Sequence, residues 1–170
     1  EISLARGKGI DTIITDHHQL PDALPEAFAT IHPKAAGETY PFRFLAGGGV
    51  AFKLAQGLLH SKKCNLAERE CERQEKWLLD LVALSSVADM VELIGENRVL
   101  VKFGLMVLAK TRRLGLQKLI EEARISKRFT AQTISFQIAP RINAAGRMDH
   151  ANTAYMLLRA SENSEAIRLA

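Results

Sequence analysis

The chain has 170 residues, of which 47% are hydrophobic and 25% are charged, and its formal net charge is +4 at pH 7. This composition excludes a largely disordered protein, because the apolar residues suffice to form a core. No apolar run is long enough to span a bilayer, so we expect no membrane partner. The modest positive charge is compatible with an anionic partner but does not require one.

The two cysteines, Cys64 and Cys71, are seven residues apart in a segment that we expect to be helical, and they match no CxxC pattern. We interpret them as reduced thiols, which predicts an intracellular, cytoplasmic location. His60 precedes Cys64 by four residues, but a structural zinc site needs four ligands and the sequence offers no evident fourth.

An apolar, β-branched run from Ile10 to Thr15 ends at Asp16, His17 and His18. Such a run predicts a strand buried on both faces, as in a parallel sheet. Open α/β sheets bind ligands beyond the carboxyl ends of their strands. An acid and two imidazoles at that position form a donor set for a divalent metal, and a polar turn after the strand is the alternative.

The surrounding segments are expected to form a helix tail over residues 1–9 and a second strand over residues 27–32. His32 is interpreted as a surface histidine at the strand end, with a third imidazole near the site as the alternative. Three glycines, Gly47 to Gly49, then open a helix. They allow the helix to start close to the sheet, and they are a weaker signal for a phosphate site, because the Lys-Ser/Thr of a P-loop is missing.

The second half of the chain is predicted to be helical. Apolar spacing indicates a helix from Trp77 to Ala88 that faces the core. Asp89 follows at the negative end of the helix dipole, where the residues alone favour a solvated acid unless a cation is near. Residues 96–110 are apolar on most faces, which predicts a helix buried between layers or domains. Further helices are expected over residues 116–123, from an N-cap at Thr130 to about Ile138, and over residues 151–170.

The segment PRINAAGR, residues 140–147, places Arg141, Asn143 and Arg147 around small residues. Guanidinium groups bind phosphate in a bidentate manner, and small residues let a ligand backbone approach closely. The residues support a phosphate-binding segment and a turn between two helices equally.

The combination of TDHHQLP, GGGVAFKLAQGL, SSVADMVEL and APRINAAGR resembles the DHH phosphoesterase superfamily, and within it the enzymes that degrade single-stranded DNA. The resemblance covers essentially the whole chain and implies an α/β fold. Residues 1–94 would be the carboxyl-terminal part of a parallel sheet flanked by helices. Connecting helices (95–124) and a helical segment leading toward a second domain (125–170) would follow. The implied activity is metal-dependent hydrolysis of DNA phosphodiesters, processive from a 5′ end.

The resemblance also implies roles for individual residues. His17 and Asp89 are expected to bind two Mn²⁺ or Mg²⁺ ions together with residues outside the chain. His18 is expected to contact the scissile phosphate or assist proton transfer, and Asp16 to orient the histidines. The residues expected to bind DNA phosphates are Arg141, Asn143 and Arg147. The implied partners are single-stranded DNA, a single-strand-binding protein and a helicase.

The chain departs from the superfamily pattern in two respects. No Asp-x-Asp motif precedes Asp16, and the GGGH-type motif of the second domain is missing. We therefore expect an internal fragment that carries part of a metal site and is inactive alone. Two alternatives stay open. One is an oligoribonuclease, nucleotide phosphatase or pyrophosphatase of the same superfamily, and the other is a non-catalytic relative that binds nucleic acid.

Overall fold

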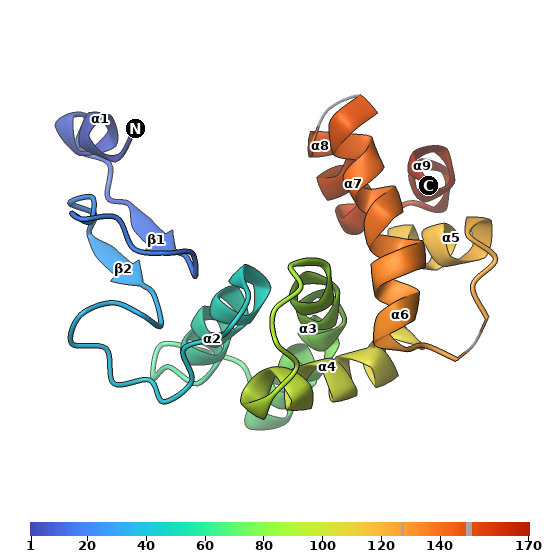
Figure 1. Cartoon of the computed structure of the whole chain (residues 1–170), viewed down its shortest axis with the longest axis horizontal. Coiled ribbons are helices and arrows are strands. Elements are labelled where there is room, and N and C mark those ends of the chain that lie inside the picture. The colour runs from blue at the N-terminus through green and yellow to red at the C-terminus, as the bar shows by residue number, and fades with distance from the viewer. Residues whose placement is uncertain (127, 149–150) are drawn as a thin grey trace.

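The computed structural model describes residues 1–126, 128–148 and 151–170, and it joins a small sheet to a larger helical body (Figure 1). The first elements are α1 (Ile2–Gly7), β1 (Ile13–Thr15), β2 (Ala29–Ile31), α2 (Gly47–Leu59) and α3 (Glu68–Ala88). The later elements are α4 (Gly95–Leu108), α5 (Leu114–Glu122), α6 (Ala131–Thr133), the π-helical segment η1 (Ile134–Ile138), α7 (Ala139–Met148), α8 (Ala151–Arg159) and α9 (Asn163–Leu169). Within the described ranges, no helix is both long enough and apolar enough to cross a membrane.

The strands β1 and β2 pair in parallel, with Thr15 opposite Ile31. The expected strand of residues 10–15 is shortened to three residues, and Ile13 has 54% of its surface exposed. The prediction of burial on both faces is therefore wrong. A parallel strand is buried only where other strands and helices cover it, and in the described residues β1 pairs with β2 alone. The Asp16 N–H donates to the Ile31 carbonyl (3.2 Å), which extends the pairing to the polar loop.

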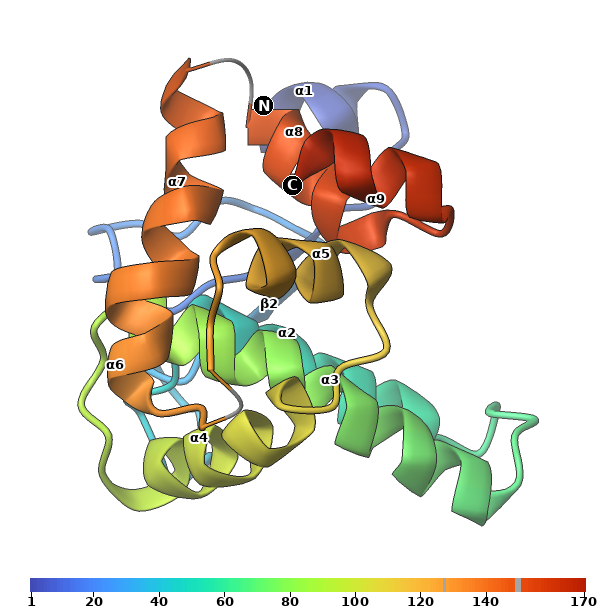
Figure 2. The ribbon, with the colours of Figure 1, turned by 90° about the vertical axis from the view of Figure 1, so that its right-hand side faces the viewer.

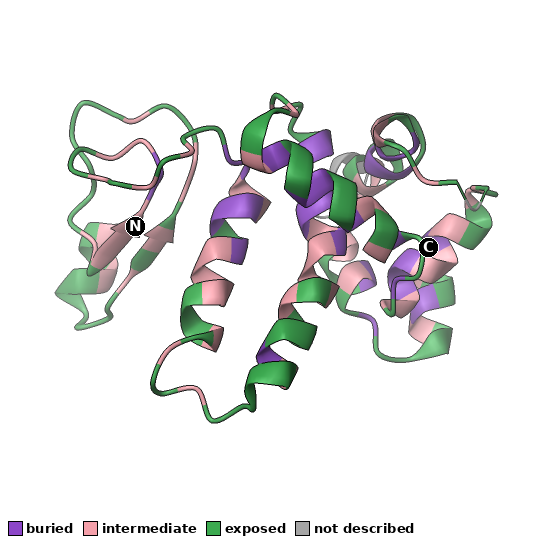
Figure 3. Cartoon of the chain, turned by 90° about the horizontal axis from the view of Figure 1, so that it is seen from below, coloured by how far each residue is buried: buried purple, intermediate pink, exposed green. Residues whose placement is uncertain are grey.

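The helix α3 belongs to both apolar cores of the molecule. Val82 packs in one core, which α2 and α4 complete through Val50, Phe52 and Leu100. The other core contains residues of α4, α5, η1, α7 and α8 together with three residues of α3, namely Ala83, Leu84 and Val87. Full burial of each valine, leucine, isoleucine or phenylalanine side chain in these cores stabilises the fold by about 1.5–3 kcal/mol relative to exposure. Figure 3 shows these buried residues at the ends of α2 and α3 that lie away from their connecting loop.

The helix α4 is less buried than the sequence predicted. Leu100 and Leu108 face the cores, whereas Val99, Phe103 and Met106 are about half exposed. In the described residues this face is therefore not buried between layers, and its burial between domains stays a prediction. An apolar pattern identifies helix faces that avoid charge, but it does not say which element covers each of them.

The two cysteines lie in different kinds of structure. Cys71 lies in a helix, α3, as expected, and it is buried there. Cys64, which was also expected to be helical, lies in the loop between α2 and α3, where its N–H donates to the Ser61 carbonyl (3.0 Å). Both thiols are free, and their sulfur atoms are 3.8 Å apart. His60 contacts the carboxylate of Glu75.

The long C-terminal helical rod begins where the sequence predicted. The Thr130 hydroxyl accepts the Thr133 N–H (3.3 Å) and the Thr133 hydroxyl accepts the Thr130 N–H (3.1 Å), which is a capping box. The helix does not stop near Ile138 but continues through η1 and α7, and Figure 2 shows α6 and α7 as one continuous rod. Pro140 has no N–H to donate and its ring crowds the preceding turn, and the wider π turn comes immediately before it. The alternative of a turn between two helices for residues 140–147 is therefore wrong.

The polar contacts of Asp80 connect α3 to the segment between α4 and α5. This carboxylate is 1% exposed, accepts the hydroxyl of Thr111 (2.7 Å) and pairs with Nε of Arg113 (3.3 Å). Burial of an ionised group is tolerated only when its oxygens are hydrogen-bonded, as they are here.

Gly104 sets the separation of α3 and α4. A Cβ there would lie 2.4 Å from the Leu79 carbonyl oxygen and 2.5 Å from the Ala83 Cβ. We predict that Gly104→Ala lowers the free energy of unfolding by about 1–3 kcal/mol, because backbone must move. Urea denaturation measures this value.

The matched control for that substitution is Gly57→Ala. A Cβ on Gly57, near the exposed end of α2, meets nothing within 4 Å. This change should leave stability unchanged or raise it by up to about 1 kcal/mol through helix propensity. Equal effects of the two substitutions on the free energy of unfolding would show that the close contact of α3 with α4 does not require glycine at position 104.

Candidate metal centre

Asp16, His17 and His18 form a polar loop directly after β1. Asp16 Oδ1 accepts the backbone N–H groups of His17 (2.7 Å) and His18 (3.3 Å). The same oxygen lies 2.6 Å from His18 Nδ1, so Nδ1 carries the proton and donates it. Nε2, the other nitrogen of this exposed ring, takes no part in this contact. The ligand atoms of the three residues lie within 4.8 Å of one another.

These hydrogen bonds control the protonation of Asp16. Desolvation raises the pKa of the carboxyl group, but the His18 ring and the two backbone N–H groups stabilise the anion more strongly. The net result lowers the pKa of Asp16 from its ordinary value of 3.8 to about 2. Asp16 is therefore ionised at all but strongly acidic pH, and its Oδ1 is engaged in orienting the loop.

His17 and Asp89 reach the same place from different elements. His17 Nε2 lies 3.5 Å from Asp89 Oδ2, and the two side chains are 16% and 37% exposed. Asp89 is the C-cap residue of α3, and its N–H donates to the Ser85 carbonyl (2.9 Å). The structure therefore pairs Asp89 with an imidazole and does not leave it as an isolated solvated acid. This pairing can offset the unfavourable position of the carboxylate on the helix dipole.

The spacing of His17 and Asp89 fits a shared divalent cation. Two ligands that are each about 2.1 Å from one ion, at a right angle, lie about 3 Å apart. The observed 3.5 Å between Nε2 and Oδ2 is close to this separation. Mn²⁺ binds both an imidazole nitrogen and a carboxylate oxygen, whereas Mg²⁺ prefers the carboxylate oxygen.

The start of α2 closes the site on another side. A Cβ on Gly47 would lie 3.4 Å from His17 Cδ2, and a Cβ on Gly48 would lie 2.5 Å from the Ser85 Cβ. The Gly48 N–H donates to the Ser85 hydroxyl (3.0 Å). The glycines thus permit a close approach, as expected, but the approach is to the His17 ring and to α3. The helix start also places partial positive charge near His17.

Lys34 is a site residue that the sequence analysis missed. Its Nζ donates to the carbonyl oxygens of His17 (2.8 Å) and His18 (3.5 Å), which ties the loop after β1 to the loop after β2. The available signal was its position, because parallel strands end at the same edge of a sheet. A cation three residues after β2 therefore had to lie near the polar residues that follow β1.

His32 is buried, with 2% of its surface exposed, so its interpretation as a surface histidine is wrong. Its Nδ1 accepts the backbone N–H of Lys34 (3.1 Å), because the chain turns back over the ring after β2. In the described residues, the group of close metal-ligand atoms consists of Asp16, His17 and His18 and does not include His32.

The predicted phosphate-binding residues lie on α7. Arg141 is exposed and donates to the Gln137 carbonyl of its own helix (2.6 Å), and Asn143 is also exposed. The side chain of Arg147 lies outside the described residues. Figure 1 shows α2 and α3 between β1 and α7. The structure therefore does not bring Arg141 and Asn143 against the loop formed by Asp16, His17 and His18, which we call the histidine loop.

Comparison with known proteins assigns this site to a family. The model of the DHH family, N-terminal domain, matches residues 1–85, which is half of the chain. The chain belongs to the DHH family. Its matched region contains the Asp16–His18 loop, the glycines of α2 and most of α3. Asp89 lies four residues beyond the matched region.

Curated relatives of the chain include exonucleases. The chain is 44% identical over 171 residues to the single-stranded-DNA-specific exonuclease RecJ of Bacillus subtilis (strain 168), a match that covers 100% of the chain and 20% of that protein. It is 41% identical over 173 residues to RecJ of Haemophilus influenzae, covering 99% of the chain and 30% of that protein. The chain therefore spans less than a third of the length of these relatives.

Solved structures give the same assignment. A crystal structure of exonuclease RecJ bound to manganese superposes with a TM-score of 0.80 at 30% identity, covering 99% of the chain and 40% of that structure. RecJ from Thermus thermophilus in complex with Mn²⁺ gives a TM-score of 0.77 at 30% identity, covering 98% and 24%. The α/β fold expected from the sequence is confirmed by these superpositions.

The lowered pKa of Asp16 predicts a pH-dependent stability. Because its pKa is about 2 in the folded chain, against 3.8 ordinarily, the ionised carboxylate stabilises the fold above about pH 4. This contribution is lost as the pH falls toward 2. In urea denaturation, the stability difference between wild type and Asp16→Asn should therefore shrink from pH 5 to pH 2. Its size is limited because the side chain is 40% exposed. A difference that is constant with pH would contradict the hydrogen-bonded arrangement.

Proposed function

We propose that the protein containing this chain is a metal-dependent exonuclease that hydrolyses single-stranded DNA from the 5′ end. The observation that carries the proposal is the approach of His17 Nε2 and Asp89 Oδ2 to 3.5 Å. It occurs in a chain that is 44% identical along its whole length to a single-stranded-DNA-specific exonuclease. The manganese and magnesium complexes of the similar structures support Mn²⁺ or Mg²⁺ as the ion.

Each residue of the site has a separate role in this proposal. His17 and Asp89 hold a divalent cation, which when bound supplies Lewis-acid stabilisation of phosphate charge and activation of water. Asp16 holds the His18 ring through Nδ1, as a carboxylate does beside many metal-site histidines. His18 then presents Nε2 to the scissile phosphate, where it can donate or accept a proton. Lys34 fixes the backbone of both histidines.

The DNA backbone is proposed to contact α7. Its exposed Arg141 and Asn143, with Arg147, would bind phosphates without reading bases, which suits a nuclease with little sequence preference. In this arrangement residues 1–94 form part of the catalytic domain, residues 95–124 connect it, and residues 125–170 lead toward the second domain. A cytoplasmic role in DNA repair and recombination, with a single-strand-binding protein and a helicase supplying the strand, completes the proposal.

Substrate choice tests the proposal against its alternatives. The full-length protein is incubated with Mn²⁺ and either 5′-phosphorylated single-stranded DNA, short RNA or pyrophosphate. We expect nucleotides released from the 5′ end of the DNA at the highest kcat/KM, and no turnover after chelation of the metal. Preference for pyrophosphate or short RNA would favour the other superfamily activities, and binding without turnover would favour a non-catalytic relative.

We predict that His17→Ala and Asp89→Ala abolish turnover in the full-length protein, because each removes a metal ligand. Asp16→Asn should reduce turnover by about 10–100-fold, because the ionised carboxylate that orients the His18 ring beside the phosphate is lost, an effect of the size seen for carboxylates that orient metal-bound histidines. Steady-state kinetics with Mn²⁺ measure these effects. His60→Ala is the matched control, since His60 is an exposed histidine at the other end of α2. Unchanged turnover in Asp89→Ala would refute the ligand assignment.

We also predict that Arg147→Ala weakens binding of single-stranded DNA about equally for all sequences. The slope of log affinity against log salt concentration should become less steep by about 0.7, which is the contribution of one phosphate contact on a single strand. Fluorescence anisotropy over a range of salt concentrations measures both quantities. Arg168→Ala, on the exposed side of α9, is the control and should bind as the wild type does. An unchanged salt slope in Arg147→Ala would exclude a phosphate contact.

A further inference from the structure

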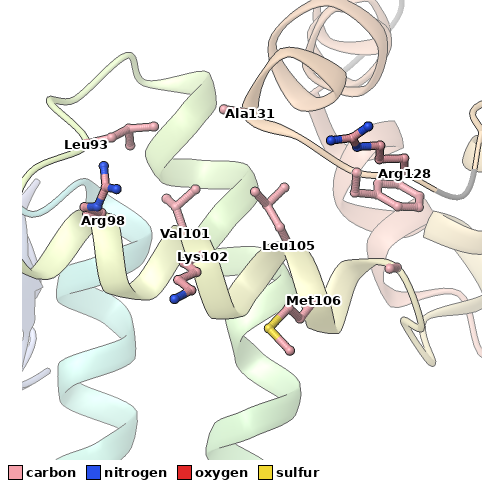
Figure 4. A pocket seen from close by; sticks show the side chains of 10 residues that line it. Leu93, Arg98, Val101, Lys102, Leu105, Met106, Arg128 and Ala131 are labelled. Carbon is pink, nitrogen blue, oxygen red and sulfur yellow. The ribbon is translucent and has the colours of Figure 1, made fainter.

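A first hollow, of about 550 Å³, lies between α4 and the segment that precedes α6. Arg98 and Lys102, one turn apart on α4, line it together with Arg128 of the facing segment (Figure 4). Val101 and Leu105 provide apolar surface between these cations. In the described residues, none of the three cations forms an ion pair with a carboxylate.

A second hollow, of about 450 Å³, borders another side of α4 and shares Met106 with the first. Its walls are mainly apolar and include Trp77 of α3 and Phe103 of α4. Lys76 and Lys110 are among the cations that line it. Within this chain, Met106 is 56% exposed and Phe103 is 48% exposed.

A third hollow, of about 470 Å³, shares Arg73 and Trp77 with the second. It adds Arg112, whose guanidinium lies 3.9 Å from the centre of the Trp77 ring, and Arg159 at the end of α8. The shared residues join the three hollows into one band, which we name the cationic track. Its lining residues come from α3, α4, α8 and the segments on either side of α5, so it is separate from the histidine loop.

The charge of the cationic track is strongly one-sided. Nine cationic side chains line its three hollows in the described residues, against the single carboxylate of Asp80. That carboxylate is 1% exposed and is already bound by Thr111 and Arg113. An adjoining hollow of about 250 Å³, which shares Lys76 and Phe103 with the second, adds Lys53 and the carboxylates of Glu72 and Glu75. Two of the cations, Arg73 and Lys76, also pair with glutamates of α3, the half-buried Glu70 and the exposed Glu72. Such surface pairs contribute little and exchange readily for another anion.

The partner must therefore be anionic and must also cover apolar and aromatic side chains. A single nucleic-acid strand meets both conditions, because it presents phosphates and unpaired bases together. A duplex keeps its bases stacked inside, where Phe103 and Trp77 cannot reach them. An acidic protein segment satisfies the charges, but its carboxylate-bearing side chains offer no flat apolar face to the aromatic rings.

We propose that the cationic track binds single-stranded nucleic acid, with phosphates on its lysines and arginines and bases against Met106, Phe103 and Trp77. The identity of the strand as the enzyme's own substrate rests on the proposed function. The track is then a second contact that retains the strand while its end lies at the metal centre.

The test uses the full-length protein with the metal chelated, so that binding is measured without cleavage. The probe is a labelled oligothymidylate of about 30 nucleotides, long enough to span more than one binding element. Lys102→Glu/Lys110→Glu reverses two exposed charges of the track. We expect its affinity to fall by about tenfold or more at low salt, with the salt slope reduced by about 1.4.

The matched control is Lys62→Glu/Lys63→Glu in the exposed loop between α2 and α3. It makes the same change in net charge outside the track and should bind within about twofold of the wild type. Circular dichroism confirms that each variant is folded. If the two double variants bind the oligothymidylate equally, the proposal is overturned.

A third variant, Phe103→Ala, separates stacking from charge. It should weaken oligothymidylate binding by about fivefold or more while leaving the salt slope unchanged. Binding of poly-glutamate is measured in parallel as a model of an acidic protein segment. The proposal fails if Phe103→Ala has no effect and the Lys102/Lys110 variant loses affinity for poly-glutamate and for oligothymidylate equally, because the occupant is then an acidic protein segment. Wild-type hydrolysis of the same strand with Mn²⁺ is assayed separately. Absence of hydrolysis would refute the proposed function, and the binding data would still show whether the cationic track binds single-stranded nucleic acid.

Discussion

The burial of the second half of α3 is the interaction on which the rest of the structure depends. Val82 faces one core and Ala83 and Val87 face the other, so the helix cannot rotate without exposing apolar surface on one side. Interiors are packed too densely to absorb such a rotation. The neighbouring helices approach α3 at glycines, Gly48 on α2 and Gly104 on α4. The residue that follows α3, Asp89, therefore points in a direction that two cores determine.

The candidate metal centre is assembled from short segments that have little stability of their own. A parallel pair of three-residue strands is too small to persist alone, and the loop after β1 is held by contacts from outside the sheet. Lys34 holds its carbonyl oxygens, Gly47 lies against the His17 ring, and Asp16 organises its N–H groups. Only His17 faces Asp89. The adjacent histidines thus have different surroundings, one confined between elements and one exposed, which is how neighbouring residues of one type acquire different roles.

The sequence predicted the features that depend on local patterns. The strand end at Asp16, the helix start at Gly47 and the cap at Thr130 are each specified by a few neighbouring residues, and the structure contains all three. The exposure of Ile13 and the burial of His32 could not be predicted, because both depend on which segments lie alongside. The position of Lys34 after β2 and the resemblance to the superfamily pointed to the contacts of Lys34 with the histidine loop and of Asp89 with His17, but no local pattern specifies either contact. Those contacts join positions 17 and 72 residues apart.

The π-helical turn of η1 has a consequence for the direction of α7. A π turn holds one residue more than an α turn, and each residue of a helix advances the side-chain direction by about 100°. The extra residue before Pro140 therefore rotates every later side chain of the rod, including Arg141 and Asn143, by about that angle. A sequence lacking one residue in this segment would keep its length and its caps almost unchanged, yet would present its arginines to a different side of the molecule. The side of the molecule that Arg141 and Asn143 face is thus encoded upstream of them, by a local irregularity in the helix.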